Sequence, residues 1–255
     1  MIHAFSASEL LTVWEQGIGQ SHVAKALALL ALAAPEAARE TFAALSIGRR
    51  DAQLLALRER LFGSHLVSVA VCPQCAQRLE LTVQMADIRA DTGEPQPQTL
   101  HVEADGYEAT FRLPNSEDLI NVQSGYTRAE EVSAASHALL SRCLLQVRHA
   151  DHEPQSGAEV PITDLSPALM TAITAAMEQA DPQANVSLRL TCTECGHCWS
   201  AAFDITAYLW GEINDWAHRI LREVHVLAST YGWRETDILQ LSARRRQMYL
   251  QMLGL

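Results

Sequence analysis

The 255-residue sequence lacks several features that would assign it to a common class of protein. Its longest apolar run, residues 26–34, is well short of the roughly 20 residues that a transmembrane helix needs. Basic residues are in deficit, with 19 Lys and Arg against 30 Asp and Glu and a net charge of −11. This balance argues against broad electrostatic binding to DNA, RNA or anionic lipid. We therefore expect no membrane segment and no extended nucleic-acid surface, although a local basic patch is compatible with the composition.

The sequence also lacks the motifs of common enzyme active sites. It contains no G-x-S-x-G, no phosphate-binding loop, no dinucleotide fingerprint and no H-E-x-x-H. His149, Asp151 and His152 lie close together, but Pro154-Gln155-Ser156-Gly157 follows them, which favours a solvated loop over a metal site. Only scattered His and Asp residues support a hydrolase with its site in residues 91–182. We therefore expect a protein that is not an enzyme.

Cysteine is scarce, and four of the six cysteines form two C-x2-C pairs, Cys72 with Cys75 and Cys192 with Cys195. Two such pairs are the ligand set of a structural, tetrahedral Zn²⁺ site. The pairs are 116 residues apart, whereas an ordinary zinc ribbon separates them by roughly 15–20 residues. One Zn²⁺ ion bound by both pairs would therefore clamp the middle of the chain shut.

Other interpretations of the cysteines stay open. The opening residues do not resemble a signal peptide, so we expect a reducing cytosol, where two disulfides are disfavoured. A thioredoxin-like dithiol would need a β-α-β pattern around the pair, which is not visible. His197 or Cys198 could replace one ligand of the second pair. Cys143 lies on an apolar helical face and is expected to be a buried, small apolar residue.

The apolar periodicity predicts an α+β fold that is mainly helical. Residues 1–65 and 207–255 are expected to form helical regions, because apolar residues recur there every three or four positions and serines precede several helices. Residues 66–90 and 183–206 alternate with period two on both sides of each cysteine pair. We predict that they form two β-hairpins with the cysteines at their turns, the halves of a split zinc ribbon.

Residues 91–182, between the two halves of the ribbon, are long enough to be an inserted subdomain. Asp105-Gly106 separates two alternating runs, which is the strongest short-range signal for a β-hairpin. Ser116 is expected to cap one helix, a longer helix is predicted across residues 129–147, and Pro167 suits the first turn of another.

Two short segments resemble each other, Leu45-Ser46-Ile47-Gly48-Arg49-Arg50 and Leu241-Ser242-Ala243-Arg244-Arg245-Arg246. Each places a serine cap before a basic first helical turn. Positive charge at a helix N-terminus opposes the helix dipole, so local stability does not explain the arginines. They are expected either to reach acidic neighbours on other helices or to contact an acidic partner surface.

The segment from Tyr231-Gly232-Trp233 to Leu241, with the helix Arg244–Leu250 after it, resembles the C-terminus of base plate proteins of contractile-tailed, T-even-like phages. It is also similar to proteins of phage-derived contractile injection systems. In these proteins an aromatic-Gly-Trp turn precedes an Ile-Leu-x-Leu segment and an Arg-rich last helix. Leu45–Asp51, upstream of a C-x2-C pair, resembles proteins encoded near tail genes. The resemblance implies a tail or base plate component, or an assembly chaperone for one, without catalytic residues.

Together these observations predict a non-enzymatic structural or chaperone-like protein of a contractile tail base plate. It would act through contacts with a base plate, hub or spike protein, in the bacterial cytosol and within a phage-like particle. The alternative is a zinc-ribbon adaptor of transcription or nucleic-acid machinery, which the net charge of −11 disfavours. The sequence leaves the oligomeric state open.

Overall fold

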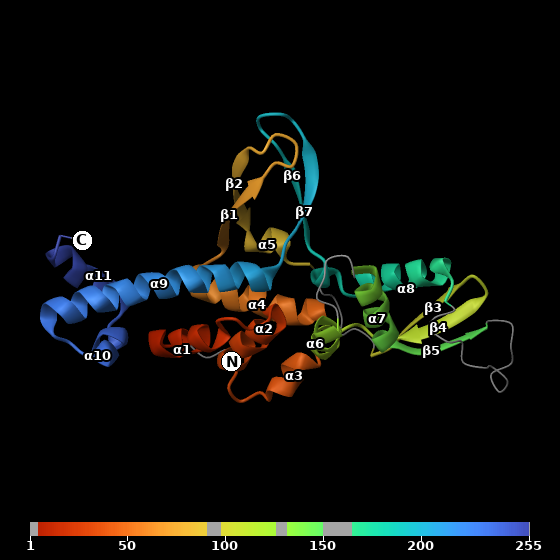
Figure 1. Cartoon of the computed structure of the whole chain (residues 1–255), viewed down its shortest axis with the longest axis horizontal. Helices are drawn as coiled ribbons and strands as arrows, with labels where there is room; N and C mark the ends of the chain where they lie inside the picture. Colours follow the sequence, from red (N-terminus) through yellow and green to blue (C-terminus); the bar gives the residue numbers. More distant parts are fainter. Residues whose placement is uncertain (1–4, 91–97, 126–131, 150–164, 255) are drawn as a thin grey trace. The chain divides into compact units, whose positions relative to one another are not determined.

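The computed structural model describes residues 5–90, 98–125, 132–149 and 165–254. The fold is α+β and mainly helical, with small antiparallel sheets, as the sequence predicts (Figure 1). The chain divides into two compact units, one formed by Met1–Arg39 with Asp204–Leu255 and the other by Glu40–Phe203. Among the described helices, none is both long and apolar enough to cross a membrane.

The first unit joins helices from both ends of the described chain. They are α1 (Ala7–Gly17), α2 (His22–Ala33), α9 (Ile205–Tyr231), α10 (Glu235–Gln240) and α11 (Ala243–Met252). The side chains of Ser6, Ser21 and Ser242 accept backbone N–H groups at the starts of α1, α2 and α11. These serines are N-caps, which explains where the three helices begin.

The long helix α9 organises this unit because α1, α2, α10 and α11 all contact it. Its buried side chains recur every three or four residues, the spacing of one helical face: Leu209, Ile213, Ala217, Ile220, Val224 and Leu227. On α1, Gly17 lies so close to the Trp210 ring that an added Cβ would lie 2.0 Å from it. The close packing of α1 on α9 therefore requires a glycine at this position.

The second unit contains the remaining elements. They are α3 (Arg39–Ala43), whose first residue belongs to the first unit, α4 (Ile47–Phe62), β1 (His65–Val71), β2 (Arg78–Gln84), α5 (Met85–Ile88), β3 (Leu100–Ala104), β4 (Tyr107–Phe111), α6 (Ser116–Gly125), α7 (Val132–Cys143), β5 (Leu144–His149), α8 (Pro167–Ala180), a 3-10 turn (Pro182–Ala184), β6 (Ser187–Thr191) and β7 (Cys198–Ala202). Strands β1–β2 and β6–β7 form two separate hairpins, while β3, β4 and β5 form a three-stranded sheet in that order.

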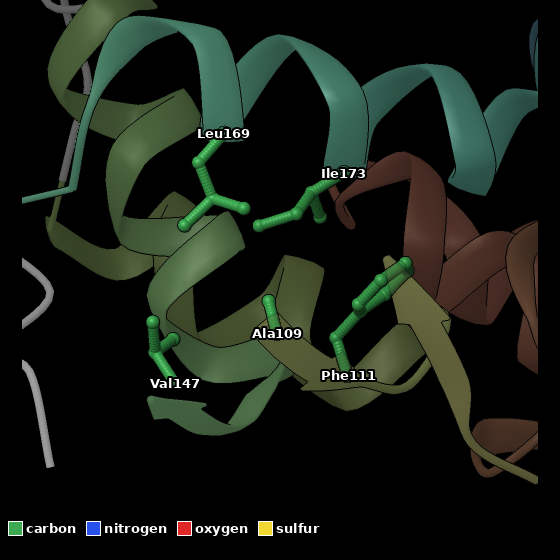
Figure 2. Packing of buried hydrophobic residues seen from close by; sticks show 5 residues of the cluster. All are labelled: Ala109, Phe111, Val147, Leu169 and Ile173. Carbon is green, nitrogen blue, oxygen red and sulfur yellow. The ribbon is translucent and has the colours of Figure 1, made fainter. Parts of the chain in front are cut away.

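Helix α8 covers one face of the three-stranded sheet. Figure 2 shows Leu169 and Ile173 of α8 directed toward Ala109, Phe111 and Val147 of the sheet, and these five side chains are buried together. The β3–β4 connection is the predicted two-residue turn, because Asp105 and Gly106 both have positive φ, of 55° and 75°.

Two predictions for this region were wrong. Ser116 does not cap α6, because the helix already includes Ser116 and the side chain of Asn115 accepts the Asp118 amide at 3.0 Å. The helix predicted across residues 129–147 ends at Cys143, and residues 144–149 form β5, which pairs antiparallel with β4. Residues 129–131 of that prediction lie outside the described residues. Pairing with β4 satisfies the backbone of Leu144–His149 and buries Val147 beneath α8, which favours the strand over a longer helix.

A buried carboxylate joins the sheet to helices α6 and α7. Asp118 accepts two hydrogen bonds from the Arg112 guanidinium, at 2.6 and 2.9 Å, and one from Arg142 at 3.1 Å. The Asn115 amide also donates to it, at 3.1 Å. Burial alone would raise the pKa of Asp118, but these donors outweigh burial and hold the pKa below its ordinary value of 3.8. Asp118 is therefore an ionised anchor.

The two ends of the segment between the hairpins lie together. The side chain of Gln183, which is 3% exposed, accepts a hydrogen bond from the Ala90 amide at 2.8 Å and donates to the Ile88 carbonyl at 3.3 Å. Nearby, Asp181 accepts the Gly48 amide at the N-terminus of α4, at 2.8 Å. The chain thus leaves the first hairpin and returns to the second at one place beside α4.

Candidate metal centre

Each cysteine pair lies at the turn of an antiparallel hairpin, as the alternating sequence predicts. In the first hairpin Val71 pairs with Arg78 immediately before and after the turn, and in the second Thr191 pairs with Cys198. The segments 72–77 and 192–197 that connect the paired strands have equal length. In Figure 1 the turns of the β1–β2 and β6–β7 hairpins lie next to each other. The cysteine sulfurs of one turn lie 3.6 and 3.7 Å from those of the other.

The two turns share one backbone hydrogen-bond pattern. The Cys72 amide donates to the Gln77 carbonyl and the Ala76 amide donates to the Cys72 carbonyl, both at 2.9 Å. In the second turn the Cys192 amide donates to the His197 carbonyl at 2.8 Å, and the Gly196 amide donates to the Cys192 carbonyl at 3.0 Å. The two turns therefore have the same backbone hydrogen bonds, and each directs its two cysteine sulfurs to one side. We call each of these C-x2-C turns a knuckle.

The residue after the second cysteine of each knuckle has a left-handed backbone. Gly196 has φ +72°, a conformation that glycine adopts without steric cost. Ala76 occupies the equivalent position with φ +60°, where a Cβ is unfavourable. The first knuckle therefore carries local strain that the second avoids.

The four sulfurs converge. Cys72 Sγ lies 3.7 Å from Cys195 Sγ, Cys75 Sγ lies 3.6 Å from Cys192 Sγ, and all four lie within 4.8 Å of one another. A tetrahedral Zn²⁺ with Zn–S bonds of about 2.3 Å separates its sulfurs by about 3.8 Å. All four cysteines are free, and the two cross-hairpin separations far exceed the roughly 2 Å of a disulfide. The arrangement can hold one tetrahedral metal ion.

The knuckle amides favour thiolate at one of the four sulfurs. Burial acts to raise the pKa of Cys72, but the amides of Cys75 and Gln74 donate to its sulfur and lower the pKa from 9.0 to about 7. The Gln77 amide likewise acts to lower the pKa of Cys75, yet the neighbouring Cys195 thiol and burial outweigh it and raise that pKa to about 12. Several thiolates at this separation repel one another, so a cation is needed before all four lose their protons.

Apolar side chains cover the cluster on one side. Cys72 and Cys192 are each 1% exposed and pack with Leu79, and Trp199 lies against the same group, whereas Cys75 and Cys195 are exposed. The four-sulfur cluster is therefore half-buried between the two hairpins.

The two alternative ligands lie outside the four-sulfur group. The His197 ring stacks on Trp199, with ring centroids 6.0 Å apart and planes 9° apart. The sulfur of Cys198 contacts the Thr191 hydroxyl at 3.4 Å and the Gly196 carbonyl at 3.7 Å. Among the described residues, the metal-ligand types gather only at Cys72, Cys75, Cys192 and Cys195.

Two further predictions concern residues away from this centre. Cys143 is fully buried, as expected, and burial raises the pKa of its thiol to about 12. His149 ends β5 and packs against Tyr107, with ring centroids 4.4 Å apart, so it is part of a strand and not of a loop. Residues 150–153 of the same prediction lie outside the described residues.

Each of the two similar segments contains one buried arginine and at least one that is half-buried or exposed. Arg50 and Arg246 are buried and pair with carboxylates, Arg50 with Asp51 at 2.7 Å and Arg246 with Glu223 at 2.9 Å. Arg49 is half-buried and lines a cavity of about 220 Å³. The predicted contact with an acidic residue of another helix is confirmed for Arg246, because Glu223 belongs to α9, whereas Arg50 pairs with Asp51 of its own helix α4.

Comparison with known proteins assigns the chain to a family. Residues 22–207 match the family described as "T4 bacteriophage base plate protein". The matched range contains Leu45–Asp51 and both cysteine pairs, whereas the segment from Tyr231 onward lies beyond it. Searches of the curated proteins and of the solved structures give no match. Because the match covers well over half of the sequence, the chain belongs to the T4 bacteriophage base plate protein family.

Proposed function

We propose that this base plate family protein is a non-catalytic structural or assembly subunit whose two hairpins are locked together by one structural Zn²⁺ ion. Cys72, Cys75, Cys192 and Cys195 would be the ligands, and the convergence of their sulfurs within 4.8 Å is the observation that carries the metal site. Four thiolates form a closed coordination sphere that leaves no position for water or substrate. When bound, the ion supplies cross-linking and no reaction chemistry.

The hairpins explain why a metal would be needed. β1–β2 and β6–β7 each form a two-stranded sheet with no further strand among the described residues. An isolated two-stranded hairpin is marginally stable in water. A shared ion converts two marginal hairpins into one unit and brings residues 72–75 to residues 192–195, with the intervening chain closed into a loop.

A hydrogen bond at the base of the hairpins supports a division of the chain into three parts. We propose that 66–90 and 183–206 form the split ribbon, that 91–182 is an insertion, and that 1–65 and 207–255 are helical flanks. The hydrogen bond between Ala90 and Gln183 supports these boundaries, because it closes the insertion where the chain leaves and re-enters the ribbon. A segment closed in this way can fold around its own core, here the sheet covered by α8.

The proposed action is protein–protein contact with other base plate components, of which a hub or spike protein is the expected partner. The family match supports this assignment. The protein would be made in the bacterial cytosol and act there as an assembly chaperone, or remain in the finished particle.

Co-expression with the tail genes of its native cluster tests the proposal. Affinity-tagged protein is expected to co-purify with a hub or spike component, and deletion of its gene is expected to leave particles without a complete base plate. Complete, infective or contractile particles in the deletion strain would contradict the proposed role. A variant with Cys75 and Cys195 both replaced by Ser, which should lose the metal and unfold the hairpins, tests whether co-purification depends on the metal-locked hairpins.

A further inference from the structure

An open cavity lies in the second unit, where the connection between α3 and α4 meets the connection between β4 and α6. The Ile47 amide donates to the Pro114 carbonyl at 3.2 Å, and Ser46 forms an isolated antiparallel bridge with Asn115. These backbone contacts hold the two connections together and fix the walls of the cavity, which has a volume of about 220 Å³.

The described residues that line this cavity make it basic. Two of them are arginines, Arg49 and Arg112, and none is acidic. The buried Asp118 carboxylate accepts two hydrogen bonds from the Arg112 guanidinium, at 2.6 and 2.9 Å, and thereby holds it in place. Arg49 belongs to the opposite connection, at the start of α4. We call this hollow the Arg49 cavity.

Arg49 has no internal partner for its charge among the described residues. Its side chain is half-buried, but no carboxylate lies within 4.0 Å of its guanidinium and no hydrogen bond holds that group. The neighbouring Arg50, by contrast, is buried and pairs with Asp51 at 2.7 Å. A guanidinium that is partly removed from water gains more from a nearby anion than a fully exposed one does. The Arg49 guanidinium is therefore the group that the cavity offers to a ligand.

The backbone at the N-terminus of α4 does not supply the site. The first three amides of the helix already donate to the Pro114 carbonyl, the Asp181 carboxylate and the Ser46 hydroxyl. A positive side chain in the first turn also opposes the helix dipole, so the stability of α4 does not explain Arg49. The attraction of the cavity for an anion therefore rests on the arginine side chain.

The size and charge of the cavity indicate which anion fits it. Small-molecule sites usually enclose about 300–1,000 Å³, so a cavity of about 220 Å³ suits one or two side chains better than a metabolite. A polyanion such as nucleic acid would be repelled by a chain of net charge −11, whereas a single carboxylate interacts mainly with the guanidinium beside it. An acidic side chain of another protein meets both conditions.

We propose that the Arg49 cavity binds an Asp or Glu side chain of a partner protein in the base plate, with the Arg49 guanidinium as the anchor. A planar guanidinium can donate two parallel hydrogen bonds to one carboxylate, and arginine is frequent among the residues that carry most of the binding energy of an interface. This inference rests on the proposed function for the identity of the partner, and it specifies how that partner is recognised. Of the two interpretations of the similar segments, contact with an acidic partner surface thus applies to Arg49.

NMR titration of the metal-loaded full chain, labelled with ¹⁵N-arginine, tests the cavity without a partner. The Arg49→Lys spectrum identifies the Arg49 Nε signal, because that signal is missing from it. Acetyl-glutamate N-methylamide should shift the signal in a saturable way with a millimolar Kd, whereas the uncharged acetyl-glutamine N-methylamide should bind at least about tenfold more weakly. The signals of the exposed Arg78 and Arg189 should stay in place. Absence of a saturable shift would overturn the proposal, as would inorganic phosphate that binds more tightly than the glutamate probe.

Co-expression with the tail genes of the native cluster tests the partner. Recovery of the base plate component that co-purifies with the wild type should fall about tenfold with Arg49→Glu. Arg49→Gln, which removes the charge without reversing it, should also lower recovery. Arg189→Glu is the matched control, because it makes the same change in charge at an exposed hairpin residue and should retain the component. Circular dichroism confirms that each variant is folded.

A photo-crosslinker at the exposed Ala44, which lines the cavity, should label an acidic peptide of that component. Replacing the acidic residue of that peptide by Arg should restore the binding that Arg49→Glu loses. A component that both Arg49 variants retain at the wild-type level would overturn the inference and leave the proposed function intact. If no component co-purifies with the wild type although the NMR shift is saturable, the proposed function is contradicted and the carboxylate site is not.

Discussion

The left-handed residues of the two knuckles provide a paired test of the metal centre's local geometry. Ala76 and Gly196 occupy equivalent positions with φ of +60° and +72°. A Cβ added at Gly196 would have no heavy atom within 4 Å, so Gly196→Ala changes backbone conformational energy and creates no clash. Ala76→Gly makes the opposite change in the other knuckle.

The expected magnitude follows from two opposing terms. A side chain in the left-handed region costs about 1–2 kcal/mol. Alanine also restricts the unfolded chain, which offsets about 0.4–1 kcal/mol. The net free-energy change is therefore about 1 kcal/mol, destabilising for Gly196→Ala and stabilising for Ala76→Gly. For a protein of this size, it corresponds to a shift in melting temperature of about 2–4 °C.

Differential scanning calorimetry of the metal-loaded protein measures both shifts. The double variant A76G/G196A, in which the two residues exchange places, should melt close to the wild type because the two effects have opposite signs. Shifts in the same direction for the two single variants would refute the equivalence of the knuckles. So would a stabilised Gly196→Ala, since it would mean that residue 196 is not left-handed.

Three further predictions concern individual side chains. Gly48→Ala should lower the free energy of unfolding by about 3 kcal/mol, because the added Cβ would lie 2.2 Å from an Asp181 oxygen. Urea unfolding measures this change, and a variant as stable as the wild type would contradict the close packing of Gly48 on Asp181. Asp118→Asn should cost about 1–3 kcal/mol at neutral pH. The lowered pKa of Asp118 makes its contribution fully present above the ordinary value of 3.8 and lost as pH falls through the folded-state value. The deficit of the variant should therefore shrink below about pH 4, and a constant deficit would argue against an ionised anchor. Cys75→Ser should abolish tight metal binding and unfold the hairpins, whereas Cys198→Ser should leave the metal content unchanged; equal losses in a colorimetric zinc assay would contradict the assignment of ligands.

The hairpins and the cysteine cluster could be predicted because their signals are local. Alternation with period two, a C-x2-C turn and Asp105-Gly106 each specify a turn within a few residues of chain. Serine caps such as Ser46 mark where helices begin for the same reason. The pairing of the two knuckles across 116 residues was predictable because one knuckle supplies only half of a tetrahedral ligand set.

The features that sequence reasoning missed depend on partners far along the chain. Leu144–His149 continues from helix α7 without glycine or proline, and only pairing with β4 makes it a strand. Asp181 and Gln183 look like surface residues in the sequence, but both are buried and hydrogen-bonded to distant segments, Asp181 to Gly48 and Gln183 to Ala90. No residue close in sequence identifies those partners, so local patterns could not indicate these contacts.

The central claim is that one zinc ion joins the two hairpins. Native mass spectrometry of the purified protein, compared with a denatured spectrum of the same sample, tests it most directly. The account predicts the mass of one Zn²⁺ per chain in the native spectrum and its loss on denaturation. A metal-free native mass, with the chain two or four hydrogens lighter than the reduced sequence, would mean disulfides and would contradict the metal clamp.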